Sequence, residues 1–305
     1  MVIVVIGSAN EDRIFRRAPS LDGGRMSYAA SHRRAAGGLG VNQAIAVARQ
    51  SSPVVYAGCV GDDDPGMRIL ERLTSEGIDT TCVDVVEGGS TGVAFVQTQP
   101  GGAHSIVVAR NANDLLTDAT IDHALRKAAP GASVLLLQGE TPPARLEHAS
   151  GAAQRRGMRT VLSLDARVSI SPTVASRCDP LIVSRPEAAW LLGEEVPTVD
   201  AARHAARTLL RSHRNVVVTL GPDGAVYTDG GDALHLAADA RFPAVDVSGA
   251  GDAFAAAVCV ALLRGAPLAE ATAYAQTVAA LTIARHGVID AFPDAAEIAS
   301  AVRSP

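Results

Sequence analysis

The amino-acid sequence predicts an α/β fold in which a mostly parallel sheet is covered by helices on both faces. Short apolar runs of β type alternate along the chain with helical patterns, which is typical of parallel sheets buried on both sides. The chain has 305 residues, enough for one large domain. Hydrophobic residues make up 48% and charged residues 19%, a composition that favours a packed core over disorder.

The strands and helices follow one another in a regular order. Continuous apolar runs predict strands at Val2–Ile6, Val54–Gly58, Val134–Leu137, Thr160–Leu164, Leu181–Val183 and Val216–Leu220. Helical periodicity predicts helices at Val41–Gln50, Met67–Glu76, Ile121–Ala128, Pro143–Arg156, Glu187–Leu192 and Val199–Ser212. The last third is different, because Ala250–Leu263 and Leu268–Ala284 form two long, alanine-rich helical patterns.

Two segments interrupt the alternation of strands and helices. Residues 13–35 and 91–109 contain strand-like stretches, Thr91–Thr98 and His104–Ala109, with no helix between them. We therefore expect a small antiparallel patch here rather than another parallel unit. The sequence has no repeats and no obvious linker, so we expect one domain over residues 1–305.

Charge and cysteine content narrow the class of protein. A formal net charge of −5 disfavours a general nucleic-acid binder. No apolar run is long enough to span a membrane, and the first residues have the pattern of a strand rather than a signal peptide. The four cysteines have no metal-ligand spacing and indicate free thiols, so we expect a cytoplasmic protein that binds neither nucleic acid nor membrane.

The strongest chemical signal lies at Gly249-Ala250-Gly251-Asp252, directly before an apolar helix. A glycine-rich turn at a helix start presents backbone N–H groups to an anion such as phosphate. A carboxylate in the first helical turn can accept a proton from an attacking hydroxyl, while the N–H groups stabilise the transferred phosphoryl. The simpler alternative is an ordinary Asp favoured at a helix N-terminus.

The N-terminal half carries polar groups suited to a polyol. Asn10 and Asp12 follow the first strand, and side chains two apart can point the same way toward adjacent hydroxyls. Gly38 permits close backbone approach in a glycine-rich segment that enters a helix, and Asn42 offers a donor and an acceptor. Turn and cap roles are the alternatives for these residues.

Together these motifs resemble the ribokinase-like (PfkB-type) family of sugar and nucleoside kinases. Asp246–Val258 is similar to the family's C-terminal signature, and Gly7-Ser-Ala-Asn-Glu-Asp12 and Gly37-Gly-Leu-Gly-Val-Asn-Gln-Ala44 are similar to its substrate segments. The resemblance implies a three-layer α/β/α sandwich with a small β-sheet lid, and an ATP-dependent kinase. It assigns Asp252 as base with the 249–251 backbone, and it assigns substrate binding to Asn10, Asp12, Gly38, Asn42, Glu140 and Asp252.

The resemblance also implies where ATP and ions bind. The nucleotide positions that match are Thr219, Gly221, Gly224, Gly251 and Gln276. Glu187 matches a residue that helps to organise Mg²⁺ through water. Positions matching a potassium site are Asp246, Ser248, Arg285 and Gly287. Three residues depart from the family's motifs: Leu39 replaces a Lys, Ser184 replaces an Asn and Ala291 replaces a frequent Ser.

These observations lead to several expected functions. Ribose or a related pentose is the expected substrate. A nucleoside is the next alternative, since Leu39 could face an apolar base. A sugar phosphate would need cations from Arg13, Arg33, Arg34 or Arg110. A catalytically silent binder of sugar or nucleotide is the alternative from another class. Relatives often pair through the lid, so a homodimer is also expected.

Overall fold

The central sheet of the computed structural model has the predicted parallel core. The structure describes residues 1–16, 28–98, 104–164, 168–229 and 231–303. Nine described strands form this sheet in the order β13-β12-β11-β10-β9-β8-β1-β4-β5, and only the β11–β12 and β12–β13 pairs are antiparallel. The strands are β1 Ile3–Ile6, β4 Val54–Gly61, β5 Asp79–Val86, β8 Val134–Gln138, β9 Arg159–Leu164, β10 Cys178–Ser184, β11 Val216–Thr219, β12 Ala225–Asp229 and β13 Asp232–Leu236.

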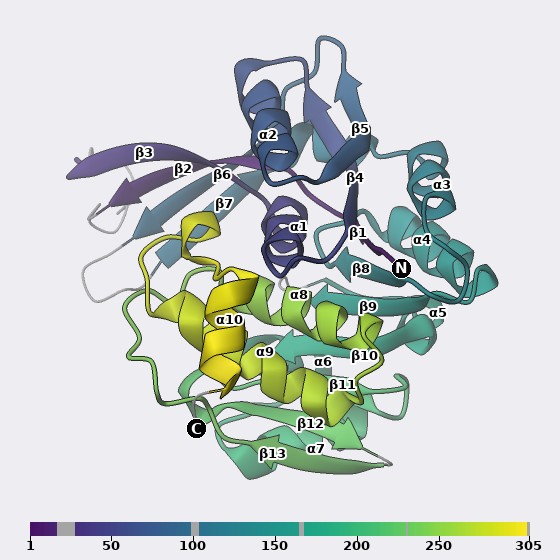
Figure 1. Ribbon diagram of the computed structural model, residues 1–305, viewed down its shortest axis with the longest axis vertical. Coiled ribbons are helices and arrows are strands. Elements are labelled where there is room, and N and C mark those ends of the chain that lie inside the picture. Colours follow the sequence, from purple (N-terminus) through teal and green to yellow (C-terminus); the bar gives the residue numbers. More distant parts are fainter. Residues whose placement is uncertain (17–27, 99–103, 165–167, 230, 304–305) are drawn as a thin grey trace.

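Helices cover both faces of this sheet, which makes three layers (Figure 1). Successive side chains of a strand point to opposite faces, so Ile3 and Val5 enter one buried core while Val4 and Ile6 enter the other. The first core is covered by α1 Leu39–Arg49, α2 Asp64–Ser75, α8 Ala250–Leu263, α9 Leu268–Ile283 and α10 Ala295–Arg303. The second core is covered by α3 Asp118–Arg126, α4 Pro143–Arg155, α5 Pro172–Arg177, α6 Arg185–Leu192 and α7 Val199–Leu209. Short 3₁₀ turns lie at η1 Asn111–Leu115, η2 Gly221–Asp223 and η3 Ile289–Ala291.

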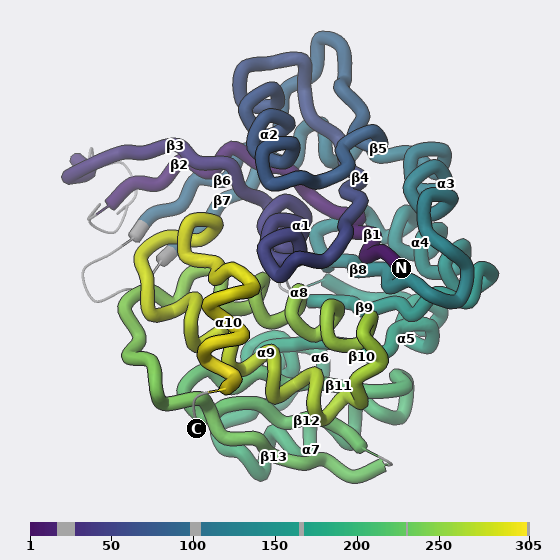
Figure 2. The backbone as a smooth tube through the Cα atoms, in the orientation of Figure 1, coloured from purple at the N-terminus to yellow at the C-terminus, as the bar shows by residue number. Residues whose placement is uncertain are grey.

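A second sheet, the lid, extends from the edge of the layered body (Figure 2). Its described strands run in the order β3-β2-β6-β7, with β2 Asn10–Arg16, β3 Ser31–Gly37, β6 Gly92–Thr98 and β7 His104–Ala109. The lid segments expected at 13–35 and 91–109 fall in this sheet, although residues 17–27 and 99–103 lie outside the described part. The expected antiparallel pairing is present in β2–β3 and β6–β7, but β2 and β6 pair in parallel. The chain crosses the body between these two strands, so it returns in the same direction.

The pair Asn10 and Asp12, expected directly after β1, lies within strand β2 of the lid.

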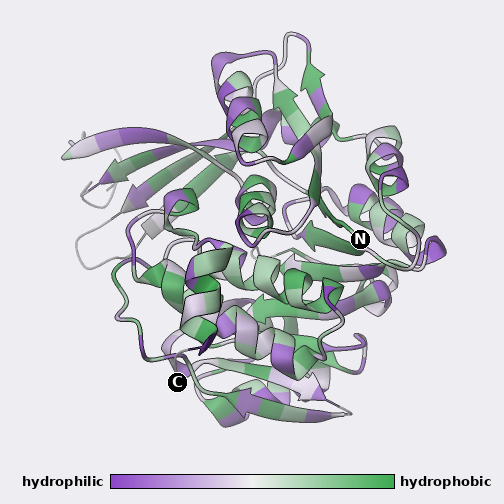
Figure 3. Cartoon of the chain, viewed as in Figure 1, coloured by the Kyte–Doolittle hydropathy of each residue, from purple (hydrophilic) through white to green (hydrophobic). Residues whose placement is uncertain are grey.

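Several elements lacked a sequence signal. Strand β5 was not predicted, because it is an edge strand with mixed burial and no continuous apolar run. Strands β12 and β13 and helices α5 and α10 were also missed. Figure 3 shows the contrast between the hydrophobic central strands and the hydrophilic β3.

The topology fixes where a ligand can bind. Strand β1 lies between β4 and β8, so the connections from this region lead to both of its sides. Open α/β sheets bind ligands at such a switch point, beyond the carboxyl ends of the strands. The lid begins at this end of β1, three residues after Gly7. Within the described residues, no helix has the length and apolar character needed to cross a membrane.

Candidate active site

Helix α8 begins at a turn that only glycine can form well. Gly249 has a φ of 78°, in the left-handed region, and a Cβ there would lie 2.9 Å from the Val288 side chain. No side chain caps the helix at Gly249. The first N–H groups of a helix have no partner within it, so this turn can bind an anion.

The carboxylate of Asp252 is held in the first turn of α8 by two amides from α1. Asn42 Nδ2 donates to Asp252 Oδ2 and Gln43 Nε2 donates to Oδ1, each at 3.0 Å. Gln138 Nε2 in turn donates to Gln43 Oε1 at 2.8 Å. Asp252 is only 6% exposed, so these bonds fix a nearly buried carboxylate beside the anion-binding turn. This contact joins the predicted catalytic residue to the predicted substrate residue Asn42.

The substrate side of the site is built from the start of the lid. Asn10 Oδ1 accepts from Asn113 Nδ2 at 2.9 Å, and the backbone N–H of Ala9 donates to Asn113 Oδ1 at 2.8 Å. A Cβ on Gly92 would lie 2.1 Å from Asn10 Oδ1, so the strand beside Asn10 needs a glycine there. Asn113 therefore positions Asn10. It was missed from the sequence because no motif marks the polar segment in which it lies.

Glycines keep the floor of the site open. A Cβ on Gly37 would lie 2.1 Å from Asp12 Oδ2, and this shows that Gly37 and Asp12 share one face of the lid. Gly38 has a φ of 89°, and a Cβ there would lie 2.8 Å from the Ser8 carbonyl oxygen. The Gly-Gly pair thus lets the backbone pass directly beneath the residues that follow β1.

Glu140 lies at the end of β8, on the other side of β1. The hydroxyl of Ser8 donates to Glu140 Oε2, and the Arg110 guanidinium donates to the Glu140 carbonyl oxygen. Burial raises the pKa of Asp12 to about 7, helped by the charge of Glu140 and opposed by the charge of Arg33. Two carboxyl groups kept close to each other are typical of a functional site rather than a structural one.

The predicted nucleotide residues fall in two groups. Thr219 ends β11 and Gly221 begins the η2 turn, so both lie at the carboxyl end of the sheet. Gly224 and Gln276 both meet the Leu236 carbonyl oxygen, which accepts from Gln276 Nε2 at 3.3 Å and would lie 2.1 Å from a Cβ on Gly224. The turn that contains Asp223 and Gly224 closes a hairpin, since β11 and β12 pair antiparallel.

Asp246 ties together the two segments predicted to hold a monovalent ion. The N–H groups of Ser248 and Gly287 donate to its two carboxylate oxygens, each at 3.0 Å. Burial opposes ionisation, but the bonds from Gly287 and Ser248 outweigh it and leave the pKa of Asp246 below its ordinary value. The side chain of Arg285 forms an ion pair with Glu297 at 2.5 Å, so its backbone carbonyl is the group available to an ion.

Glu187 caps the start of helix α6. Its Oε2 accepts from the backbone N–H of Ser184 at 2.6 Å and from the Ser184 hydroxyl, which forms a capping box at the start of α6. Direct coordination of a metal through this oxygen would break the cap. No cluster of three His, Cys, Asp or Glu side chains suited to a metal occurs among the described residues.

A three-layer α/β body, a β lid, and a fixed carboxylate at a glycine-rich helix start define a small-molecule kinase of the class that phosphorylates alcohols. The chain belongs to the pfkB family of carbohydrate kinases, whose model matches residues 2–295. It is 31% identical over 308 residues to a ribokinase of Schizosaccharomyces pombe, covering 97% of this chain and 96% of that protein. It is 31% identical over 298 residues to a deoxyribokinase of Salmonella typhi, covering 96% of each.

The fold is confirmed by a solved structure. Arabidopsis thaliana ribokinase complexed with ribose and ATP matches with a TM-score of 0.89 and 26% identity, over 100% of this chain and 99% of that chain. The predicted three-layer sandwich with a small lid sheet is therefore correct. The expectation of a phosphotransferase with an alcohol acceptor is also confirmed.

Proposed function

We propose that this protein is an ATP-dependent kinase that transfers the γ-phosphoryl group to a hydroxyl of ribose or a related pentose. One observation carries the proposal. The Asp252 carboxylate is bonded to Asn42 at the start of the α8 turn, so the base, the anion site and a hydroxyl ligand meet at one point. The related ribokinases and deoxyribokinase support a pentose as the acceptor.

The sugar is bound by groups from three elements. Asn10 and Asp12 reach it from the lid, Asn42 from α1 and Glu140 from the end of β8. Carboxylates accept from sugar hydroxyls, and the amides both donate and accept. The Oδ1 atom of Asn42 is buried and has no hydrogen-bond partner among the described residues, so a sugar hydroxyl would satisfy it.

Asp252 accepts the proton of the attacking hydroxyl. The oxygen then forms a bond to the γ-phosphorus, and the bond to the β–γ bridging oxygen breaks, leaving ADP. Backbone N–H groups of residues 249–251 stabilise the charge on the phosphoryl oxygens. The amides of Asn42 and Gln43 keep the carboxylate aimed at the acceptor, and the lid excludes water that would compete with the sugar.

Thr219, Gly221, Gly224, Gly251 and Gln276 bind ATP in this proposal. Mg²⁺ bound with ATP would neutralise part of the phosphate charge. Glu187 would help to hold it through water, which would leave the α6 cap intact. Asp246 and the carbonyls of Ser248, Arg285 and Gly287 offer hard oxygen ligands for K⁺, and the two N–H bonds to Asp246 draw these segments together.

Assembly and location form a second part of the proposal. One face of the lid carries the exposed apolar side chains of Phe95 and Val107, which lie opposite each other in β6 and β7, and Phe15 stacks between His32 and Phe95 on the same face. Such a patch suits a homodimer formed through the lids. All four cysteines are buried free thiols, which fits the reducing cytoplasm.

A substrate screen tests the proposed activity. ATP consumption would be measured with pentoses, hexoses, nucleosides and sugar phosphates, with and without K⁺. We expect ribose or 2-deoxyribose to give the highest kcat/KM, with stimulation by K⁺. Preference for a nucleoside would favour the alternative in which Leu39 faces a base. If none of the tested acceptors supports ATP consumption, the result would indicate the catalytically silent binder.

A further inference from the structure

Strand β3 carries two adjacent arginines that point to opposite faces of the lid. Side chains alternate along a strand, and in the register of β2 with β3, Asp12 lies opposite Ala35 and Ile14 opposite Arg33. Gly37 of β3 shares the face of Asp12. Arg33 precedes Gly37 by an even number of residues in the same strand, so its side chain lies on that face as well. Arg33 therefore lies on the substrate face of the lid.

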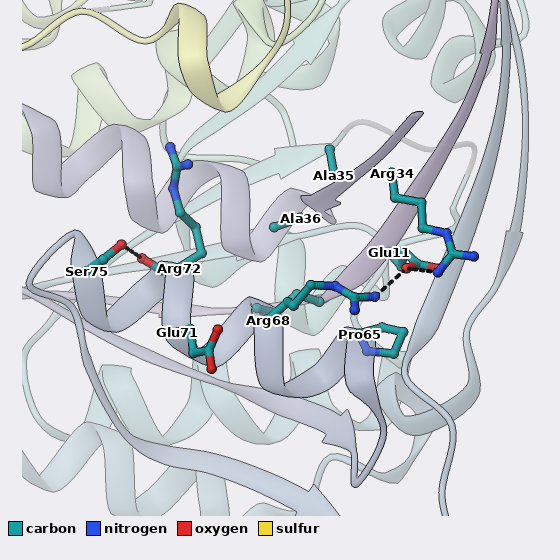
Figure 4. Close-up of a pocket in the computed structure, with 10 residues that line it drawn as sticks. Glu11, Arg34, Ala35, Ala36, Pro65, Arg68, Glu71, Arg72 and Ser75 are labelled. Atoms are coloured by element: carbon teal, nitrogen blue, oxygen red, sulfur yellow. Dashed lines mark hydrogen bonds and ion pairs between the residues drawn. The ribbon is translucent and has the colours of Figure 1, made fainter. Parts of the chain in front are cut away.

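Arg34 lies on the outer face. Its Nη1 is 3.9 Å from Glu11 Oε1, and Arg68 of α2 binds the same oxygen at 2.8 Å. Figure 4 shows these side chains along a groove of about 450 Å³ between the lid and α2. Arg13 also pairs with Glu11, at 2.7 Å. The outer arginines are thus engaged with a buried carboxylate, away from the sugar.

The Arg33 guanidinium lies near the phosphoryl end of the site. Its Nη2 is 3.8 Å from the position of a Cβ on Gly287, the residue whose N–H binds Asp246. The next residue, Val288, packs against Gly249, where the anion-binding turn begins. The charge of Arg33 also acts on Asp12, so the guanidinium lies between the sugar ligands and the turn.

Arg33 has no structural task in the part of the chain that the structure describes. The side chain is exposed, and no hydrogen bond or ion pair to a described residue involves its guanidinium. An arginine held near a cluster of carboxylates without a direct partner can bind a phosphate group with its planar donors. The lid thus presents a cation beside Gly287 that has no other partner among the described residues.

We propose that Arg33 is a catalytic residue of the lid, which binds the γ-phosphoryl group of ATP while that group passes to the sugar. The inference rests on the proposed function. As the acceptor oxygen bonds to phosphorus, the electron pair of the breaking P–O bond moves to ADP and the hydroxyl proton moves to Asp252. Arg33 stabilises the negative charge on the phosphoryl oxygens. Since Arg33 is on the lid, transfer becomes efficient only when the lid covers the sugar.

The phosphate that Arg33 recognises has a second conceivable source, a phosphate ester on the sugar itself. The place of Arg33 beside Gly287, whose neighbour Val288 packs against Gly249 of the anion-binding turn, favours the phosphoryl group of ATP. The two sources differ in their kinetic effects. A catalytic role affects turnover with plain ribose, whereas a specificity role affects only phosphorylated sugars.

The test compares Arg33→Ala and Arg33→Lys with Arg34→Ala, a control on the same strand and opposite face. We expect Arg33→Ala to lower kcat with ribose by roughly 100-fold or more, and Arg33→Lys to recover part of it. Arg34→Ala should stay within about twofold of the unaltered protein, because Glu11 keeps its closer ion pairs with Arg13 and Arg68. Calorimetry in the presence of ribose should show affinity for the β,γ-methylene analogue of ATP about tenfold weaker in Arg33→Ala, with ADP affinity unchanged.

Two results would overturn the inference. One is a match between Arg33→Ala and Arg34→Ala in both turnover and nucleotide affinity. The other is unchanged turnover with ribose combined with loss of activity on a sugar phosphate, which assigns Arg33 to the acceptor. Absence of turnover with every acceptor in the unaltered protein would contradict the proposed function instead. The calorimetric comparison still decides the role of Arg33 in that case, because it requires no turnover.

Discussion

Two uncharged side chains, Gln43 and Gln138, hold the carboxylate of Asp252 in place. Gln138 donates to Gln43, which donates to Asp252, so the chain of amides runs from β8 through α1 to α8. Hydrogen bonds from amides fix the direction of a buried carboxylate and offset part of the cost of its desolvation. The sequence motif around Asn42 contains Gln43, but only the fold brings Gln138 to it.

The variant Asp252→Asn tests the base. We expect kcat to fall by about 10³-fold, because an amide cannot accept the hydroxyl proton. The free energy of unfolding should change by no more than about 1–2 kcal/mol, since one of the two amide bonds can persist. Steady-state kinetics and urea unfolding measure the two effects. Near-normal turnover in a well-folded variant would contradict the assignment.

The pH dependence of stability tests the environment of Asp12. Its pKa rises from 3.8 to about 7 in the folded protein. Folding therefore favours the protonated form, so this contribution to stability is fully present below pH 3.8 and is lost as the pH rises through about 7. Asp12→Asn should remove the loss, which makes the variant more stable than the unaltered protein at pH 8 by up to about 4 kcal/mol.

Urea unfolding of both sugar-free proteins at pH 4 and pH 8 measures this difference. A stability gap that is the same at both pH values would show that Asp12 is not the group responsible. The KM for ribose should also increase as the pH falls below 7, because a protonated carboxyl loses acceptor capacity for sugar hydroxyls.

At the scale of elements, the start of α8 depends on a backbone shape rather than on a side chain. Gly249 has a φ of 78° and Gly265, directly after the same helix, has a φ of 84°. A Cβ on Gly249 would press on Val288, whereas one on Gly265 meets nothing within 4 Å. The two glycines thus share left-handed backbone angles but differ in their surroundings.

The pair Gly249→Ala and Gly265→Ala separates catalytic shape from helix stability. Each should cost about 1–2 kcal/mol of unfolding free energy because of its positive φ. Only Gly249→Ala should also lower kcat, by about 10²-fold, since the N–H groups of the turn move away from the phosphoryl. Thermal unfolding and kinetics give the two values. An equal loss of activity in both variants would indicate a general stability effect.

At the scale of the whole molecule, the lid contacts the body through α2, which packs against both β2 and β3, and through α1, which packs against β3. Glu11, which is 3% exposed, bridges lid and body through Arg68. The exposed apolar side chains of the lid are the surface that a second copy of the chain would cover.

Val107→Asp tests assembly through the lid. Val107 is 69% exposed, and a buried charge at a dimer contact is costly. We expect the unaltered protein to have the mass of a dimer by light scattering, and the variant that of a monomer with lower kcat/KM. Val302→Asp, on the exposed side of α10, serves as control and should remain dimeric. A monomeric unaltered protein would contradict the proposed assembly.

The sequence by itself determined the layered fold of this protein and the glycine-aspartate turn at the start of α8. Apolar runs and helical periods are local, so they indicate the β1, β4, β8 and β9 strands and the paired helices α8 and α9 without knowledge of the fold. The glycine-aspartate turn is equally local, because its φ angles and helix start depend on adjacent residues.

Only the tertiary structure decided which distant residues share the site. The parallel β2–β6 pair, the bond from Asn113 to Asn10 and the approach of Arg33 to Gly287 all join segments far apart in the chain. Edge and lid strands such as β5 and β3 carry mixed polar residues, and they are strands because neighbours supply hydrogen bonds rather than because their own pattern requires it. Long-range pairing of this kind leaves no local signal in the amino-acid sequence.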